Sequence, residues 1–211
     1  MKLTVFGATG GIGGQIVRQA LDAGHDVTAV VREPSRFTLE RPGLRVATAD
    51  PTDPEPLVPL VAGRDAVLSG IGARGRKQAG IAAVATGAIL QAMARAQVSR
   101  LLVVSAAPLA PIPVGESPVL RYLGTPVIRR VLKGVYADLA DMEALMRDSD
   151  AEWTSVRPPK LNDKPLTGVY REVVGGAVAK GFAISRADVA HAMLAMIDNP
   201  ATVRQAVGVA Y

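Results

Sequence analysis

The chain of 211 residues is 49% apolar, carries a formal net charge of +5 and contains two histidines and no cysteine. This length and apolar content are enough for one compact domain with a substantial core, which we place at residues 1–211. Disulfides, thiolate metal sites and cysteine nucleophiles are excluded, and because neither histidine has a second ligand-type residue at metal-site spacing, we expect no metal.

The chain begins with a short apolar run at residues 2–6, which fits a first strand better than a signal peptide. A glycine-rich turn and apolar residues at helical spacing follow at once, and this order predicts a strand, a tight turn and a helix. Glycines let backbone amides approach a phosphate closely, and the N-terminus of a helix attracts anions. We therefore expect a pyrophosphate here, in preference to a glycine-rich turn without a ligand. The predicted contacts are Gly7, Thr9, Gly10, Gly11, Ile12 and Gly13.

Apolar strand patterns then alternate with helical patterns. Strands are predicted at residues 26–31, 44–48, 66–69 and 100–105, and helices at residues 53–62 and 80–96. Because these apolar runs show no polar alternation, we expect a parallel sheet with helices on both faces. This is the doubly wound Rossmann α/β fold, which binds ligands beyond the carboxyl ends of its strands. No run of about 18 strongly apolar residues predicts a membrane span, so we expect a cytoplasmic protein.

The pattern changes after residue 106 and predicts a small C-terminal portion on the substrate side of the domain. Prolines make residues 107–118 a loop, and residues 119–147 are predicted as a helix with a break near Lys133 and Gly134. The last predicted elements are a strand at 153–156, a mixed segment at 161–181, a helix at 186–197 with Ser185 as N-cap and Asp188 at its third position, and a strand at 205–210.

An arginine at the end of the second predicted strand indicates the cofactor. In dinucleotide folds a carboxylate about 20 residues beyond the glycines holds the adenosine ribose, whereas an arginine there accepts a 2′-phosphate. Arg32 stands at this place, and Ser35 and Arg36 follow within reach of the same phosphate. Because a guanidinium fits a phosphate in two-point contact, the sequence favours NADP(H) over NAD(H). The alternative for Arg32 is a solvated charge at a strand end.

Two further segments are predicted to contact the cofactor. Asp50, with Pro51, ends the third strand, where a carboxylate can accept from the exocyclic amine of adenine. Asp50 could equally cap the helix that follows Thr52. At the end of the fourth strand, small residues suit a chain that passes the ribose and phosphates closely. They are Gly70, Ile71 and Gly72.

Taken together, these motifs resemble those of the atypical short-chain dehydrogenase/reductases. The similarity is greatest to the NAD(P)H-binding group that includes biliverdin reductase B (flavin reductase) and the NmrA-like proteins, and it covers nearly the whole chain. The motifs that carry it are residues 7–13 (GATGGIG), 31–34 (VREP), 49–53 (ADPTD), 65–69 (DAVLS), 104–105 (VS), 153–158 (WTSVRP) and 184–190 (ISRADVA).

A catalytic pair common in carbonyl-reducing short-chain dehydrogenases is missing from the sequence. Those enzymes use a tyrosine as general acid, with a lysine four residues later. The residues four positions after Tyr122, Tyr136 and Tyr170 are Pro126, Ala140 and Val174. Acceptors that spread charge over a conjugated system need such a donor less. The resemblance therefore implies NADPH-dependent hydride transfer to a flavin, a quinone or a linear tetrapyrrole.

The resemblance also implies roles for residues near the nicotinamide. Ser105 matches the active-site serine of the family and is expected to bond nicotinamide or substrate, although a serine that only ends a strand is the alternative. Pro158 and Pro159 are expected to line the nicotinamide end, and Arg157 to tie down the strand end. Tyr170 is a candidate substrate contact or a core residue.

A non-catalytic alternative has the same features. NmrA-like proteins use this fold to sense NADP(H) and signal to a transcription partner, and a basic surface could serve such a partner. An epimerase or dehydratase is a weaker reading, since it would normally use the missing tyrosine. We expect a small-molecule hydride acceptor as partner, no membrane and no nucleic acid, and leave the oligomeric state open. The basic residues concerned are Arg74, Arg76, Lys77, Arg121, Arg129, Arg130 and Lys133.

Overall fold

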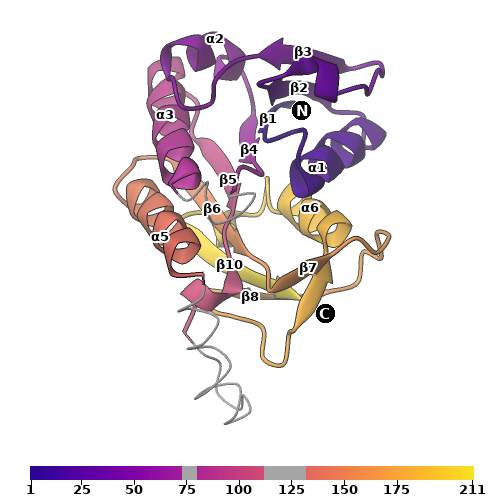
Figure 1. Cartoon of the computed structure of the whole chain (residues 1–211), viewed down its shortest axis with the longest axis vertical. Helices are drawn as coiled ribbons and strands as arrows, with labels where there is room; N and C mark the ends of the chain where they lie inside the picture. Colours follow the sequence, from indigo (N-terminus) through magenta and orange to yellow (C-terminus); the bar gives the residue numbers. More distant parts are fainter. Residues whose placement is uncertain (73–79, 112–131) are drawn as a thin grey trace.

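One twisted sheet lies between two layers of helices in the computed structural model, which describes residues 1–72, 80–111 and 132–211 (Figure 1). Within these residues the sheet has eight strands in the order β3-β2-β1-β4-β5-β6-β10-β8, and β7 and β9 form a separate pair. The main strands are β1 (Lys2–Phe6), β2 (Asp26–Val31), β3 (Leu44–Thr48), β4 (Ala66–Ser69), β5 (Arg100–Val104), β6 (Glu152–Arg157), β8 (Arg171–Val174) and β10 (Gln205–Ala210). The pair is β7 (Lys160–Asn162) and β9 (Ala183–Ser185).

The helices divide between the two faces of the sheet. Figure 1 shows α1 and α6 on one face and α2, α3 and α5 on the other. The α-helices are α1 (Gly11–Asp22), α2 (Val58–Val61), α3 (Ile81–Ala96), α5 (Lys133–Arg147) and α6 (Arg186–Ala195). The short 3₁₀ turns are η1 (Pro34–Arg36), η2 (Glu55–Leu57), η4 (Ala107–Leu109) and η6 (Pro200–Thr202).

Neighbouring residues of a strand are buried in different hydrophobic clusters, one on each face of the sheet. Val5 of β1 is buried in the cluster formed with α1 and α6, whereas Phe6 is buried in the cluster formed with α3 and α5. In β5, Leu102 is buried in the first of these clusters and Leu101 in the second. Since successive side chains of a strand point to opposite faces, a sheet covered on both sides requires these continuous apolar runs. The doubly wound α/β fold expected from the sequence is confirmed.

Several elements differ from the sequence expectation. β8 pairs antiparallel with β10, so the sheet is mostly rather than wholly parallel. The helix expected at residues 53–62 is the 3₁₀ turn η2 followed by the single turn α2, because Pro56 and Pro59 remove backbone donors. The mixed segment expected at residues 161–181 contains β8 and most of β7, which begins at Lys160, and β9 precedes α6.

The region around residues 107–147 is described only in part. α5 begins at Lys133, the place of the expected helix break, and residues 107–109 of the expected loop form η4. The described residues do not include the rest of that loop from 112 or residues 119–131 of the expected helix. They also do not include Tyr122 or the basic residues 74, 76, 77, 121, 129 and 130. Among the helices that are described, none is long and apolar enough to cross a membrane.

Candidate cofactor and acceptor site

A cavity of about 790 Å³ opens at the carboxyl ends of the parallel strands. It is lined by residues that follow β1, β2, β3, β4 and β5, together with the first turn of α3 and parts of α5 and α6. The chain crosses between the two halves of the sheet here, because β1 lies between β2 and β4. Ligands of doubly wound folds bind at this switch point, and the volume suits a cofactor or drug-sized ligand.

Where the turn after β1 packs against α1 and the end of β4, three glycines have no room for a side chain. Gly7 has φ +72°, a conformation that side chains disfavour. A Cβ on Gly13 would lie 2.2 Å from the carbonyl oxygen of Gly7, and a Cβ on Gly70 would lie 2.9 Å from the nitrogen of Gly13. Gly13 does not line the cavity; it brings the first turn of α1 against the strand ends.

The first turn of α1 is open toward the cavity. Its N-cap is Gly10, and no side chain of the described residues bonds there. The first turns of two other helices are occupied: Asp138 of α5 accepts from the backbone N–H groups of Ala82 (3.1 Å) and Ala83 (2.8 Å) in α3, and Ser185 caps α6. Because uncapped N–H groups and the helix dipole attract anions, the N-terminus of α1 is better suited to bind an anion than the N-termini of α3 and α6.

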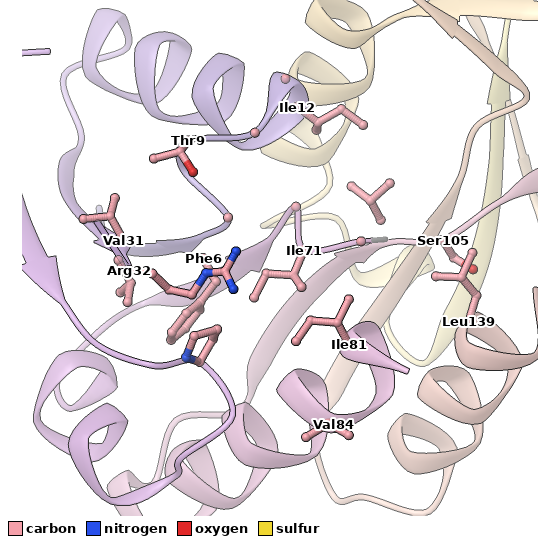
Figure 2. A pocket seen from close by; sticks show the side chains of 18 of the residues that line it. Phe6, Thr9, Ile12, Val31, Arg32, Ile71, Ile81, Val84, Ser105 and Leu139 are labelled. Atoms are coloured by element: carbon pink, nitrogen blue, oxygen red, sulfur yellow. The ribbon is translucent and has the colours of Figure 1, made fainter. Parts of the chain in front are cut away.

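Arg32, at the end of β2, lines the cavity and extends toward it in Figure 2. Within the described residues its guanidinium has no hydrogen bond or ion pair to a neighbour. Ser35 and Arg36 are exposed in η1 and do not line the cavity, and Arg36 lies 3.5 Å from the carboxylate of Glu33. Of these two arginines only Arg32 borders the cavity, and the phosphate contacts of Arg32, Ser35 and Arg36 stay predictions.

The residues after β3 and β4 also border the cavity. Pro51, Gly70, Ile71 and Gly72 line it. Asp50 does not; its carboxylate accepts from the backbone N–H (2.9 Å) and hydroxyl (2.7 Å) of Thr52. These two bonds, with a smaller contribution from the charge of Arg32, lower the pKa of Asp50. Asp50 thus forms a local turn with Thr52 and does not cap η2, whose N-cap is Pro54 without a side-chain hydrogen bond, and adenine binding stays a prediction.

Ser105, just after β5, is buried at the end of the cavity opposite Arg32 in Figure 2, beside Leu139. Its hydroxyl donates to Oε1 of Glu143 at 2.8 Å. Ser155 also donates to Oε1 at 2.7 Å, and Arg157 donates to both carboxylate oxygens. Burial alone would raise the pKa of Glu143, but these hydrogen bonds and the charge of Arg157 hold it below its ordinary value.

Three other predicted residues, Pro158, Pro159 and Tyr170, do not line the cavity. The carbonyl of buried Pro158 accepts from the N–H of Ala107 at 2.9 Å, which fixes the end of β6, and Pro159 follows it. Tyr170 bonds Nδ1 of His191 at 2.7 Å, and burial is the main cause that raises the pKa of Tyr170 to about 12. This contact fits the core alternative for Tyr170, and its substrate role stays a prediction.

Sequence reasoning missed two charged residues of the site. Arg186 lines the cavity beside Gly11, where a Cβ would lie 2.5 Å from Cδ of Arg186, and its guanidinium bonds Asp163 at 2.7 Å. Its only local signal was its position directly after the N-cap of α6. Glu143 offered no local signal, since its partner Ser105 is 38 residues away in the sequence.

A family model described as NAD(P)H-binding matches residues 7–200 of the chain. The uncharacterised protein YwnB of Bacillus subtilis is 28% identical over 206 residues, which is 95% of this chain and 93% of YwnB.

Solved structures share the whole fold. A protein of Burkholderia pseudomallei described as exported is 28% identical, with a TM-score of 0.84 and full coverage of both chains, so a cytoplasmic location stays a prediction. A short-chain dehydrogenase/reductase of Veillonella parvula, solved with NADP, is 20% identical, with a TM-score of 0.82 over 100% of this chain and 94% of that one. ChuY, an anaerobilin reductase of Escherichia coli O157:H7, is 22% identical, with a TM-score of 0.79 over 100% of this chain and 97% of that one.

Proposed function

The chain belongs to the NAD(P)H-binding family, and on that premise we propose that it is an NADPH-dependent reductase that passes hydride to a conjugated acceptor. The acceptor would be a flavin, a quinone or a linear tetrapyrrole. The observation that carries the proposal is the position of Arg32 in the same cavity as the uncapped first turn of α1. A cation for the 2′-phosphate and an anion site for the diphosphate fit NADP(H) better than NAD(H).

The residues of the cavity fit this cofactor in shape as well as charge. The close packing of Gly7, Gly13 and Gly70 holds the first turn of α1 against the ends of β1 and β4, where Gly10, Gly11 and Ile12 border the cavity. Beyond the strand ends, Ile71 and Ile81 offer apolar surface between Arg32 and Ser105. The cavity therefore offers an extended dinucleotide a positively charged end, an anion site for the diphosphate in the middle, and an apolar end with one polar group.

The acceptor class follows from what surrounds Ser105. Val104, Val135 and Leu139 line the cavity near it, and such apolar surface suits a flat conjugated ring. No tyrosine of the sequence has a lysine four residues later, so a carbonyl substrate would lack that proton donor. The bound cofactor supplies a hydride from the nicotinamide C4, and the acceptor takes its proton from solvent. The chain's own residues then mainly bind and orient the two rings.

The descriptions of two structural neighbours support the proposal. The Veillonella protein was solved with NADP, and ChuY is named as an anaerobilin reductase. Both are below 25% identity, so the shared feature is the fold, and the cofactor and acceptor of this chain need their own test.

The test is an NADPH oxidation assay followed at 340 nm with FMN, FAD, menadione and biliverdin as acceptors. We expect turnover with at least one of them and a preference for NADPH over NADH. Tight NADPH binding without turnover across the panel would instead favour the alternative, a non-catalytic NmrA-like sensor of NADP(H). Calorimetry that detects no affinity for either nicotinamide cofactor at millimolar concentration would overturn both.

A further inference from the structure

We propose that Glu143 is a positioning residue that fixes the hydroxyl of Ser105 as a hydrogen-bond acceptor toward the cavity, so that this end of the site takes a ligand group that donates an N–H. The inference rests on the proposed function and specifies the ligand chemistry at the same site. It starts from a buried charge cluster, Glu143 with Arg157, that sequence reasoning did not find.

The Glu143 carboxylate is held in its ionised form. It is 4% exposed, and Arg157 donates to it from Nε at 2.9 Å and also from Nη2. A buried carboxylate is stable as an ion when a guanidinium faces it with two-point geometry. The lowered pKa of Glu143 agrees with this geometry.

An ionised carboxylate can only accept hydrogen bonds. The hydroxyls of Ser105 and Ser155, at 2.8 Å and 2.7 Å from Oε1 of Glu143, must therefore both be donors. A hydroxyl has one proton, so the Ser105 oxygen has only lone pairs left for another partner. Within the described residues, no donor occupies them.

The free acceptor of Ser105 meets the cavity. Ser105 lines it, whereas Ser155 is 0% exposed and does not. The neighbouring lining residues Val104 and Leu139 offer no donor from their side chains. A polar atom in such apolar surroundings favours a ligand that supplies the missing hydrogen bond.

Two groups of the proposed ligands carry a suitable N–H. One is the carboxamide of nicotinamide, and the other is the ring N–H of a hydride acceptor such as N3–H of a flavin. A developing oxyanion, by contrast, would face the lone pairs of Ser105 and be disfavoured. The same feature therefore argues against a carbonyl substrate placed at Ser105.

Binding measurements on the full chain distinguish the two sources. Calorimetry gives Kd for NADP⁺ and its 3-acetylpyridine analogue, which lacks the carboxamide N–H. With NADP⁺ present, it gives Kd for lumiflavin and 3-methyllumiflavin, which lacks the N3–H. Each ligand is titrated into the wild type, Ser105→Ala and Ser155→Ala. Ser155→Ala is the matched control, because it removes a hydrogen bond to the same carboxylate oxygen outside the cavity.

We expect the wild type to favour the N–H ligand of one pair by roughly 3- to 10-fold, the size of one neutral hydrogen bond. Ser105→Ala should abolish that preference, and Ser155→Ala should keep it. In Glu143→Gln, the amide can donate to Ser105 and free its proton, so the preference should shrink or reverse. If that variant does not fold, the two serine variants still decide.

Two results would overturn the inference alone: a wild type that binds NADP⁺ but shows no preference in either pair, or a preference that survives in Ser105→Ala. Equal loss of the preference in Ser105→Ala and Ser155→Ala would also overturn it, since Ser105 would then act only through the fold. A wild type that binds no nicotinamide cofactor would overturn the proposed function and this inference with it.

Discussion

At the scale of single residues, the proposed preference for NADPH rests on Arg32. Its guanidinium extends toward the cavity, and within the described residues no carboxylate forms an ion pair with it, whereas Arg186, which also lines the cavity, is paired with Asp163. Arg32→Ala should raise Kd for NADPH by about 10- to 100-fold, because charge-assisted hydrogen bonds are lost, and should change Kd for NADH by less than about 3-fold. Calorimetry with both cofactors checks this. Arg45→Ala is the control, since it removes an equal charge from an exposed site of β3 outside the cavity. Equal losses for NADPH and NADH in Arg32→Ala would contradict the phosphate role.

At the scale of elements, the contact of α1 with the strand ends depends on Gly13. Its Cβ would meet the backbone of Gly7 at 2.2 Å, so Gly13→Ala must push α1 away from β1. We expect about 3 kcal/mol of lost stability, the upper part of the usual range for overpacking, and weaker cofactor binding. Thermal unfolding measures the loss. Gly87→Ala in α3 is the control, because its Cβ would meet only Cδ1 of Leu145 at 3.6 Å and alanine favours a helix. A Gly13→Ala variant as stable as Gly87→Ala would show that the turn has room to relax.

A second element-scale junction is formed by Asp188 in α6. Its buried carboxylate accepts from Tyr211, from Ser185, and from the backbone N–H groups of Thr167 and Gly168. Burial alone would raise the pKa of Asp188, but these bonds lower it from its ordinary 3.8 to about 2. Since the folded pKa is depressed, the stabilisation is full above the unfolded pKa and is lost as pH falls from about 4 to about 2.

Asp188→Asn should therefore cost about 2 kcal/mol near pH 7, and the difference from wild type should shrink toward zero near pH 2. Urea unfolding of both chains at pH 7, 4 and 2.5 gives the difference at each pH. If the difference in free energy of unfolding stays constant over this range, the shape of the Asp188 side chain rather than its charge stabilises the junction.

At the scale of the whole molecule, the central strands and their parallel arrangement could be predicted from the sequence, because each central strand is an apolar run bounded by turn residues. β7, β8 and β9 were not predicted, because they are short and because β8 exposes Val173 and Val174 instead of burying them. The part of the cavity between Gly7 and Arg32 is built by local motifs, and the spacing of these motifs in the sequence likewise predicted it. Glu143 and Arg186 were not predicted, because only the packing of α5 and α6 brings them to the ends of distant strands.

The cavity joins both halves of the sheet, and this predicts how the whole chain responds to its cofactor. Residues from β1 and β2 on one side and from β4 and β5 on the other line the same space, so a dinucleotide bound as proposed would contact both. A ligand that binds only the folded state at 100 times its Kd stabilises by about 2.7 kcal/mol. For a chain of this size, that raises Tm by about 5–10 °C.

Differential scanning calorimetry with NADPH should therefore show one transition that moves upward as a unit, and NADH at the same concentration should move it less. Arg32→Ala should remove most of the difference between the two cofactors while keeping a single transition. Two transitions, of which only one responds to NADPH, would mean that the C-terminal portion with β8 and β10 unfolds independently. The cavity would then depend only on the part of the chain that responds to NADPH.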